Sequence, residues 1–190
     1  FLFFSFLIQP SISSSSEIYD YETEIFLQKL IFKIKEVNNF KKNIKIHILN
    51  DKNPNAFVFN NNKLIVSSGL IEQSPDYVAL LAVLAHEVGH LQYLHIEKRQ
   101  SSIEQFSKLN VISNLALITG SLLTETPQLL TGTLASQANI NNFYFSFSRE
   151  QEREADLYSI QTIEKLNLPS ISIKKLLGIL EKNALRQGYN

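Results

Sequence analysis

Three of the four histidines in this chain fall within one short apolar stretch, AVLAHEVGHLQYLH, residues 82–95. His86 and His90 are four residues apart, and Glu87 directly follows the first of them. On a helix, positions four apart lie on the same face one turn above each other, so both imidazoles can reach one metal ion. Glu87 is rotated toward the open side of that metal, where a carboxylate can accept a proton from a water molecule. The spacing therefore predicts two metal ligands and a general base.

The chain contains no cysteine, so histidines and carboxylates must hold any metal. One zinc ion is the expected cofactor, and a catalytic zinc needs a third protein ligand and an open fourth position. No histidine follows His95 in the sequence. A downstream carboxylate is therefore the expected third ligand.

A charged run, SREQEREAD at residues 148–156, supplies the candidates for this ligand. Glu152 is the predicted ligand. Asp156 lies one turn further along the same helix face, where it can accept a hydrogen bond from a ligating imidazole and fix the orientation of the ring. Glu150 and Glu154 compete with Glu152. Because a helix turns about 100° per residue, each of them points about 160 to 200° away from Glu152, and only one of the three shares a face with Asp156.

The other two histidines are not expected to bind the metal. His95 follows His90 by five residues and is rotated about 140° from the metal-binding face, so it is expected at the surface or beside a metal ligand. His47 lies within a predicted strand, on the side opposite the isoleucines, and is expected to face solvent.

The scaffold that positions these residues is predicted from hydrophobic periodicity. Apolar residues recur at helical spacing from Glu17 to Val37 and predict a first amphipathic helix. Residues 43–49 alternate as a half-buried strand does. Two further β-rich runs, residues 55–59 and 63–66, flank Asn60-Asn61-Asn62, whose tolerance of positive φ suits a tight hairpin. A small antiparallel sheet is therefore expected before the histidine helix.

Capping signals predict the helix boundaries. Ser74-Pro75-Asp76 supplies an N-cap, a proline at the first helical position and an early carboxylate, and it predicts a long helix up to about Arg99. Ser148 to Gln151 form a capping box, which predicts a helix that stops near Pro169. A last helix is expected from Ile171 to about Arg186. The expected fold class is α+β, mostly helical, with the small sheet ahead of the metal-binding helix.

An apolar segment, residues 109–123, lies between these helices but is too short for a transmembrane span. It is expected to form a core or lid helix, and the alternatives are contact with a membrane or masking of the active site. Residues 124–142 are rich in Thr, Gln, Asn and Gly and are expected to form a loop or a weakly ordered crossover.

Composition and charge limit the class of protein. The 18 basic and 18 acidic side chains cancel, so neither nucleic acid nor an anionic membrane surface is the expected main partner. A length of 190 residues favours one domain. Residues 1–8 are almost wholly apolar and are followed by small residues, as at the end of a secretory signal. We therefore expect residues 1–16 to be the remnant of a signal peptide of an exported protein, and residues 17–190 to be the domain.

Taken together, these motifs resemble those of a known family. His86-Glu87-Val88-Gly89-His90 and residues 148–156 resemble the zinc metallopeptidase family that includes the CAAX prenyl endopeptidases, HtpX and the soluble periplasmic BepA-type proteases. Asn55-Ala56-Phe57 and Ser68-Gly69-Leu70-Ile71 resemble the strand and turn that precede the active-site helix in that family. The similarity extends over about residues 20–185.

The resemblance implies a gluzincin-type peptidase with a minigluzincin-like domain. His86, His90 and Glu152 would bind zinc, and Glu87 would be the general base. A protein or peptide substrate would lie as an extended strand along the sheet edge near Ala56 to Phe59, where main-chain hydrogen bonds give weak sequence selectivity. The soluble branch is similar to periplasmic quality-control proteases for misfolded or misassembled outer-membrane proteins. This implies a periplasmic location and, as partner, the assembly of outer-membrane proteins or a peripheral membrane contact.

The chain also departs from the pattern of the family. Asn60 to Asn62 stand where relatives often have a glycine-rich turn, and the 190 residues do not contain the several transmembrane helices of HtpX. Some relatives place a downstream histidine near the reacting carbonyl. This chain has none there, which leaves Arg149, Arg153, Tyr144 or Tyr158 to stabilise the oxyanion.

The sequence thus predicts a zinc-dependent endopeptidase that hydrolyses unfolded or misassembled proteins in envelope quality control. The alternative is a non-catalytic, chaperone-like binding module that keeps zinc for structure. A structural zinc site has no need of Glu87, which favours the enzyme. A third hypothesis is a self-inhibited enzyme whose residues 109–142 cover the metal until a partner moves them.

Overall fold

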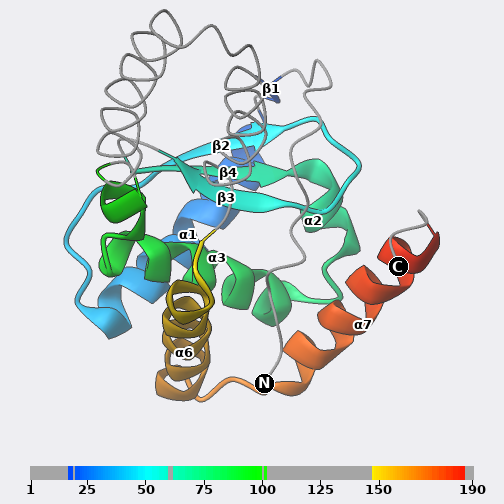
Figure 1. The fold of residues 1–190 in the computed structure, drawn as a ribbon. Helices are drawn as coiled ribbons and strands as arrows, with labels where there is room; N and C mark the ends of the chain where they lie inside the picture. The colour runs from blue at the N-terminus through cyan, green and yellow to red at the C-terminus, as the bar shows by residue number, and fades with distance from the viewer. Residues whose placement is uncertain (1–16, 19, 60–61, 100, 102–146, 187–190) are drawn as a thin grey trace, which may run out of the picture. The chain divides into compact units, whose positions relative to one another are not determined.

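The computed structural model describes residues 17–18, 20–59, 62–99, 101 and 147–186 (Figure 1). Contacts divide the chain into two compact units. The first unit contains the residues up to Tyr93 and those from Arg149 onward, and it includes all the helices and strands labelled in Figure 1. The second unit comprises Leu94–Ser148.

Three predicted segments lie outside the described residues. They are the signal-peptide remnant at residues 1–16, the apolar segment at residues 109–123, and the polar segment at residues 124–142. None of the helices in the described part of the chain is both long and apolar enough to span a bilayer.

A four-stranded sheet forms one layer of the first unit. Its strands are β1 (Glu17–Ile18), β2 (Lys45–Leu49), β3 (Ala56–Phe59) and β4 (Lys63–Ser67), in the spatial order β1-β2-β4-β3. The α+β class is confirmed, but the sheet is mixed rather than wholly antiparallel. β3 and β4 pair antiparallel, as the predicted hairpin requires, whereas β2 and β4 run parallel. The reason is the path of the chain, which forms β3 at the far edge and returns as β4 between β3 and β2.

Helix α1 (Tyr21–Asn38) begins at Tyr21 rather than at the predicted Glu17. Asp20 is the N-cap, because its carboxylate accepts a hydrogen bond from the Glu22 N–H at 3.2 Å. Residues 17–18 instead pair antiparallel with β2. Apolar periodicity continues across this boundary, so only the cap distinguishes helix from strand here.

Two helices follow the sheet where the sequence predicted one. Ser67 caps the short helix α2 (Ser68–Gln73), and Asp76 rather than Ser74 caps α3 (Tyr77–Gln92). The Asp76 carboxylate accepts a hydrogen bond from the Ala79 N–H at 2.9 Å.

Helix α3 ends at Gln92 rather than near the predicted Arg99. The reason is Leu94, whose φ of 57° is a left-handed conformation that a right-handed helix cannot contain. Residues 95–99 form a separate helical segment in the second unit.

The last two helices agree with the predicted boundaries. α6 (Arg149–Lys165) begins directly after Ser148, and α7 (Ile171–Arg186) follows the turn at Pro169. Asn167, with a φ of 53°, ends α6, and the next N–H, that of Leu168, donates to the Ile163 carbonyl at 3.0 Å. This left-handed residue just past the helix satisfies carbonyls that would otherwise lack partners.

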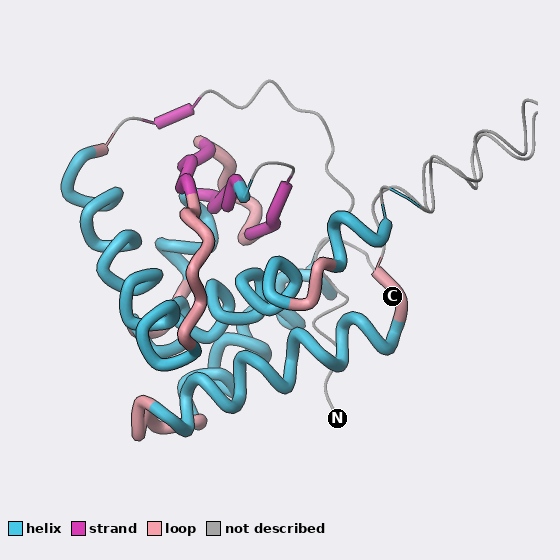
Figure 2. The backbone as a smooth tube through the Cα atoms, turned by 90° about the vertical axis from the view of Figure 1, so that its left-hand side faces the viewer, coloured by secondary structure: helices cyan, strands magenta, loops and turns pink. Residues whose placement is uncertain are grey.

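Helix α3 is the centre of the hydrophobic core. All its residues from Val78 to Leu91 are buried, as expected for a helix that is apolar on all sides. β3, α1, α6 and α7 all pack against it, with the sheet on one side and α6 on another (Figures 1 and 2). Ser159 of α6 anchors one of these contacts by donating its hydroxyl to the Ala82 carbonyl at 2.7 Å. The helix that carries the predicted metal ligands is therefore held by several elements at once.

Helix α6 lies very close to α3 at Gly89. A Cβ at this position would lie 3.1 Å from the Cα of Ala155 and 3.1 Å from the Cβ of Tyr158. Both distances are shorter than ordinary van der Waals contact, and the Ala155 atom belongs to the backbone. The missing side chain of Gly89 therefore sets how closely the two helices can pack.

Replacing Gly89 tests this constraint. We expect Gly89→Ala to lower the free energy of unfolding by about 1 to 3 kcal/mol, because the added methyl group overpacks the interface between the helices. Urea denaturation followed by circular dichroism measures the change.

Gly178→Ala is the matched control, because Gly178 lies in α7, where an added Cβ would meet no described atom within 4 Å beyond its chain neighbours and the nearby backbone of its own helix. It should stabilise the protein by about 0.5 to 1 kcal/mol, since alanine favours a helix over glycine. Equal stabilisation by both substitutions would refute close packing at Gly89.

Candidate metal centre

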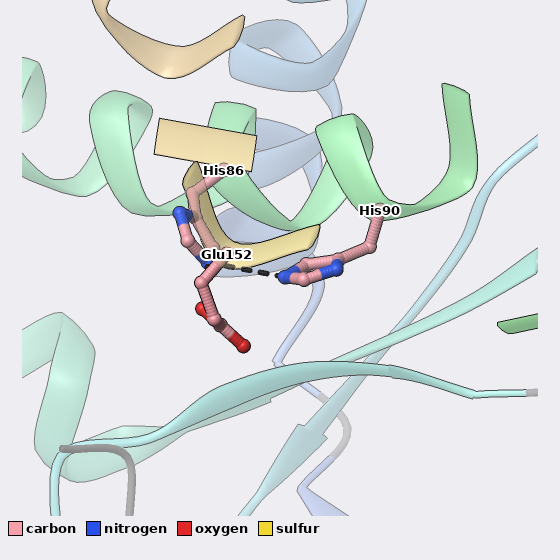
Figure 3. A group of neighbouring side chains, drawn as sticks. All are labelled: His86, His90 and Glu152. Carbon is pink, nitrogen blue, oxygen red and sulfur yellow. Dashed lines mark hydrogen bonds and ion pairs between the residues drawn. The ribbon is translucent and has the colours of Figure 1, made fainter. Parts of the chain in front are cut away.

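The side chains of His86, His90 and Glu152 point toward one another (Figure 3). The two imidazoles come from successive turns of α3, and the carboxylate comes from the first turn of α6. Nε2 of His86 lies 3.2 Å from Nε2 of His90 and 3.4 Å from Oε2 of Glu152. One ligand atom from each residue lies within 4.8 Å of the other two. Among the described residues this is the one such group of three that could hold a metal ion.

These separations fit a bound metal ion. Two ligand atoms held 2.0 to 2.1 Å from a tetrahedral ion lie about 3.3 to 3.4 Å apart. The His86–His90 and His86–Glu152 distances of 3.2 and 3.4 Å are close to this value. Two imidazoles and one carboxylate are also a donor set of catalytic zinc sites, which keep a fourth position open. The three residues could therefore hold one divalent ion and leave room for a further ligand.

The close approach at Gly89 explains how Glu152 reaches the histidines. Ala155, which contacts Gly89, shares a helix face with Glu152 three residues earlier and lies next to Asp156. The packing of Ala155 on α3 therefore brings both carboxylates toward His86. A larger residue at position 89 would move them away together.

Asp156 holds the other side of the His86 ring. Oδ1 of Asp156 lies 2.9 Å from Nδ1 of His86, so that Nε2 is left to face His90 and Glu152. Burial by itself lowers the pKa of His86, but the Asp156 and Glu152 carboxylates outweigh it and raise this pKa to about 9. A carboxylate in this position fixes the orientation of a ligating imidazole. The sequence prediction placed Asp156 in this position.

The two competitors of Glu152 lie elsewhere. Glu150 pairs with Arg153 on the exposed side of α6, at 2.5 Å from Nη2 and 3.1 Å from Nε. Glu154 is half-buried. Glu152 is the glutamate of this run that approaches the imidazoles, at 3.4 Å from His86.

Glu87 is buried next to the first histidine, with only 4% of its surface exposed. Its Oε2 accepts a hydrogen bond from the backbone N–H of Val58, in β3, at 3.1 Å. The sequence prediction did not include this contact. No local signal could have found it, because it joins residues 29 positions apart on different elements.

The remaining histidines differ in how they meet the prediction. His47 is partly exposed, and its Nδ1 lies 2.6 Å from Oε1 of Glu17. His95 is fully buried, so the expectation of a surface position is wrong. It lies beyond the break at Leu94, in the second unit, where its ring is 6.1 Å from the ring of Phe147. The rotation angle predicted for His95 assumed one continuous helix and does not apply.

The residues predicted as candidates for oxyanion stabilisation occupy different environments. Arg153 is held by Glu150, and Arg149 is exposed. Tyr158 is buried against Tyr93, with ring centroids 6.1 Å apart, and burial raises the pKa of its hydroxyl. That hydroxyl has no hydrogen-bond partner in the part of the chain that the structure describes. Tyr144 lies outside the described residues.

Comparison with known proteins places this geometry in context. The family model of Peptidase family M48 matches residues 24–182. The β-barrel assembly-enhancing protease of Escherichia coli is 27% identical over 136 residues, which cover 70% of this chain and 27% of that protein. The mitochondrial metalloendopeptidase OMA1 of Schizosaccharomyces pombe is 27% identical over 64% of this chain and 33% of that protein. The metalloprotease LoiP of Escherichia coli is 29% identical over 68% of this chain and 47% of that protein. The chain thus spans less than half the length of each of these relatives.

The raised pKa of His86 predicts how pH acts on the metal-free protein. A histidine whose pKa is higher in the folded state stabilises that state below its ordinary pKa of 6.5, and this contribution is lost as pH rises toward about 9. Asp156→Asn removes one of the carboxylates that raise the pKa of His86. The difference in unfolding free energy between wild type and Asp156→Asn should therefore shrink as pH rises from 6 to about 9.

Urea denaturation of the chelator-treated protein at pH 6, 7.5 and 9 measures this difference. Glu164→Gln, which removes an exposed carboxylate of the same helix, should differ from wild type by a similar amount at each pH. A difference between wild type and Asp156→Asn that stays constant from pH 6 to 9 would contradict the role assigned to Asp156.

Proposed function

The chain belongs to peptidase family M48, a family of zinc metallopeptidases, and on this basis we propose that it is a zinc-dependent endopeptidase. The convergence of His86, His90 and Glu152 carries the proposal, because these three side chains come from two helices and present the donor atoms that zinc uses. In this proposal the three residues bind one zinc ion.

Each further side chain of the site has a role that follows from its position. A bound zinc ion would polarise the scissile carbonyl and lower the pKa of a water molecule toward neutrality. Glu87, one residue from His86, accepts the proton of the attacking water and later delivers it to the leaving amine. Asp156 orients the His86 ring through Nδ1. The burial of His86 and Glu87 excludes bulk water and strengthens these electrostatic interactions.

Strand β3 is the proposed binding site for the substrate backbone. It is the last strand in the sheet that the described residues form, packs against α3, and contacts Glu87 through Val58. An extended peptide that pairs with this edge would be held by main-chain hydrogen bonds close to the general base. The residues predicted for this role, Ala56 to Phe59, are those that form β3.

The substrate class is proposed from strand pairing and from the relatives. Only an unfolded or locally extended segment can add a strand to β3, so misfolded or misassembled proteins fit the site better than folded ones. One relative bears the name β-barrel assembly-enhancing protease. We therefore propose a role in envelope protein quality control, in an exported, periplasmic protein whose partner is the assembly of outer-membrane proteins.

A non-catalytic binding module that keeps zinc for structure is the second candidate. A structural zinc site needs only the residues that bind the ion, so it would not need a further buried carboxylate beside them. Glu87 occupies that position and is held there by Val58. This observation favours the enzyme.

Replacing Glu87 tests the proposed mechanism directly. Glu87→Gln should keep stoichiometric zinc and lower the rate of β-casein cleavage at least about a hundredfold, because the general base is lost while the ligands remain. Cleavage is followed on gels and zinc by metal analysis. Glu164→Gln on the exposed face of α6 should cleave at the wild-type rate. Cleavage by Glu87→Gln at the parent rate would show that this residue is not the base.

A further inference from the structure

The hydrogen bond between Glu87 and Val58 has a consequence for how substrate reaches the site. The donor is a backbone N–H on an edge strand, and the acceptor is the carboxylate of the proposed general base. Neither group is on the surface, since Val58 is 3% exposed and Glu87 is 4% exposed. A buried carboxylate requires a donor, and a backbone N–H is a donor that cannot rotate away.

The outward edge of β3 is defined by its hydrogen bonds. Asn55, which precedes the strand, faces β4, because its N–H donates to Ser67 Oγ at 2.8 Å and its carbonyl accepts from the Ser67 N–H at 2.9 Å. Backbone groups of alternate residues in a strand point to opposite edges. Phe57 and Phe59 therefore also face β4, whereas Ala56 and Val58 face the opposite edge, along which none of the described strands pairs. The bond from Val58 to Glu87 agrees with this alternation.

Substrate and Glu87 need the same donor. A peptide that pairs antiparallel with β3 forms its ladder with the outward groups of Ala56 and Val58, and a substrate carbonyl then faces the Val58 N–H. This N–H has one hydrogen and cannot make a full bond to the carbonyl and to the carboxylate at the same time. The two acceptors therefore compete.

We infer that the Val58 N–H is a shared donor that holds Glu87 in the free protein and passes to a substrate carbonyl when an extended segment pairs with β3. This inference rests on the proposed function and extends it. Substrate binding frees the Glu87 carboxylate at the moment when a carbonyl is in place for attack. Val58 is in this sense a positioning residue that acts through Glu87.

The exchange also selects for the length of the substrate. A hydrogen bond to a charged carboxylate is stronger than one to a neutral carbonyl, so the exchange at Val58 is unfavourable taken alone. A segment that forms further ladder bonds along β3 compensates for this loss, and a di- or tripeptide cannot. The site therefore discriminates against short peptides and favours long extended segments of unfolded proteins.

Two inactive variants separate the competition from catalysis. Glu87→Gln keeps an acceptor oxygen for the Val58 N–H, whereas Glu87→Ala removes it, and both lack the carboxylate that cleavage needs. With the zinc-loaded 190-residue chain and fluorescein-labelled β-casein, Glu87→Ala should bind about tenfold more tightly than Glu87→Gln, since the competing acceptor is gone. Adding Val58→Pro to Glu87→Ala removes the donor itself and should abolish this gain. Proline is tolerated there because the N–H does not face β4.

Amide hydrogen exchange measured by NMR without substrate reports on the bond itself. The Val58 amide should be protected in wild type and exchange at least about tenfold faster in Glu87→Ala, because its acceptor is lost. The amides of Phe57 and Phe59, which face β4, serve as internal controls and should not change.

The outcomes separate the inference from the proposed function. Equal protection of Val58 in wild type and Glu87→Ala overturns the inference, and so does equal β-casein affinity of the Ala and Gln variants when both bind. In either case the endopeptidase proposal survives. No binding of β-casein to either variant contradicts the proposed substrate site on β3, and the inference fails with it.

Discussion

Helix α6 can pack closely against α3 because residue 89 of α3 is a glycine and has no side chain. The contact of Gly89 with the backbone of Ala155 fixes the separation of the two helices. Glu152, on the same face of α6 as Ala155, and Asp156, the next residue after Ala155, then meet His86 at 3.4 and 2.9 Å. The candidate metal centre is therefore a product of helix packing as much as of its ligands. The glycine within the His86–His90 motif has a structural task of its own, distinct from the spacing of the two histidines.

The buried polar side chains of α3 need partners that compensate for their removal from water. His86, Glu87 and His90 are all less than 5% exposed, and they lie in a helix whose other buried residues are apolar or glycine. At least two of them have partners on other elements of the fold. His86 is compensated by the carboxylates of α6, and Glu87 by the N–H of an edge strand. Polar groups so deeply buried require partners with fixed geometry, which also supplies the preorganisation that catalysis needs.

Much of this arrangement could be predicted from the sequence, because strong local signals specify it. The spacing of His86 and His90 and the capping box before Glu152 predict that the three candidate ligands lie on two helices. Local sequence signals did not predict several other features of the fold. Pairing with β2 takes Glu17 out of the first helix, β4 returns between β3 and β2, and Leu94 adopts a left-handed conformation that separates His95 from α3. The contacts of Glu87 with Val58 and of Gly89 with Ala155 join distant segments, and no pattern within one element encodes them.

The central claim is that His86, His90 and Glu152 bind one metal ion together. A crystal structure of the zinc-loaded protein, with anomalous diffraction collected at the zinc edge, tests it most directly. We predict one anomalous peak, about 2.0 to 2.1 Å from Nε2 of each histidine and about 2.0 to 2.2 Å from a carboxylate oxygen of Glu152. A zinc ion bound elsewhere, or bound to the histidines with the Glu152 carboxylate turned away, would contradict the account.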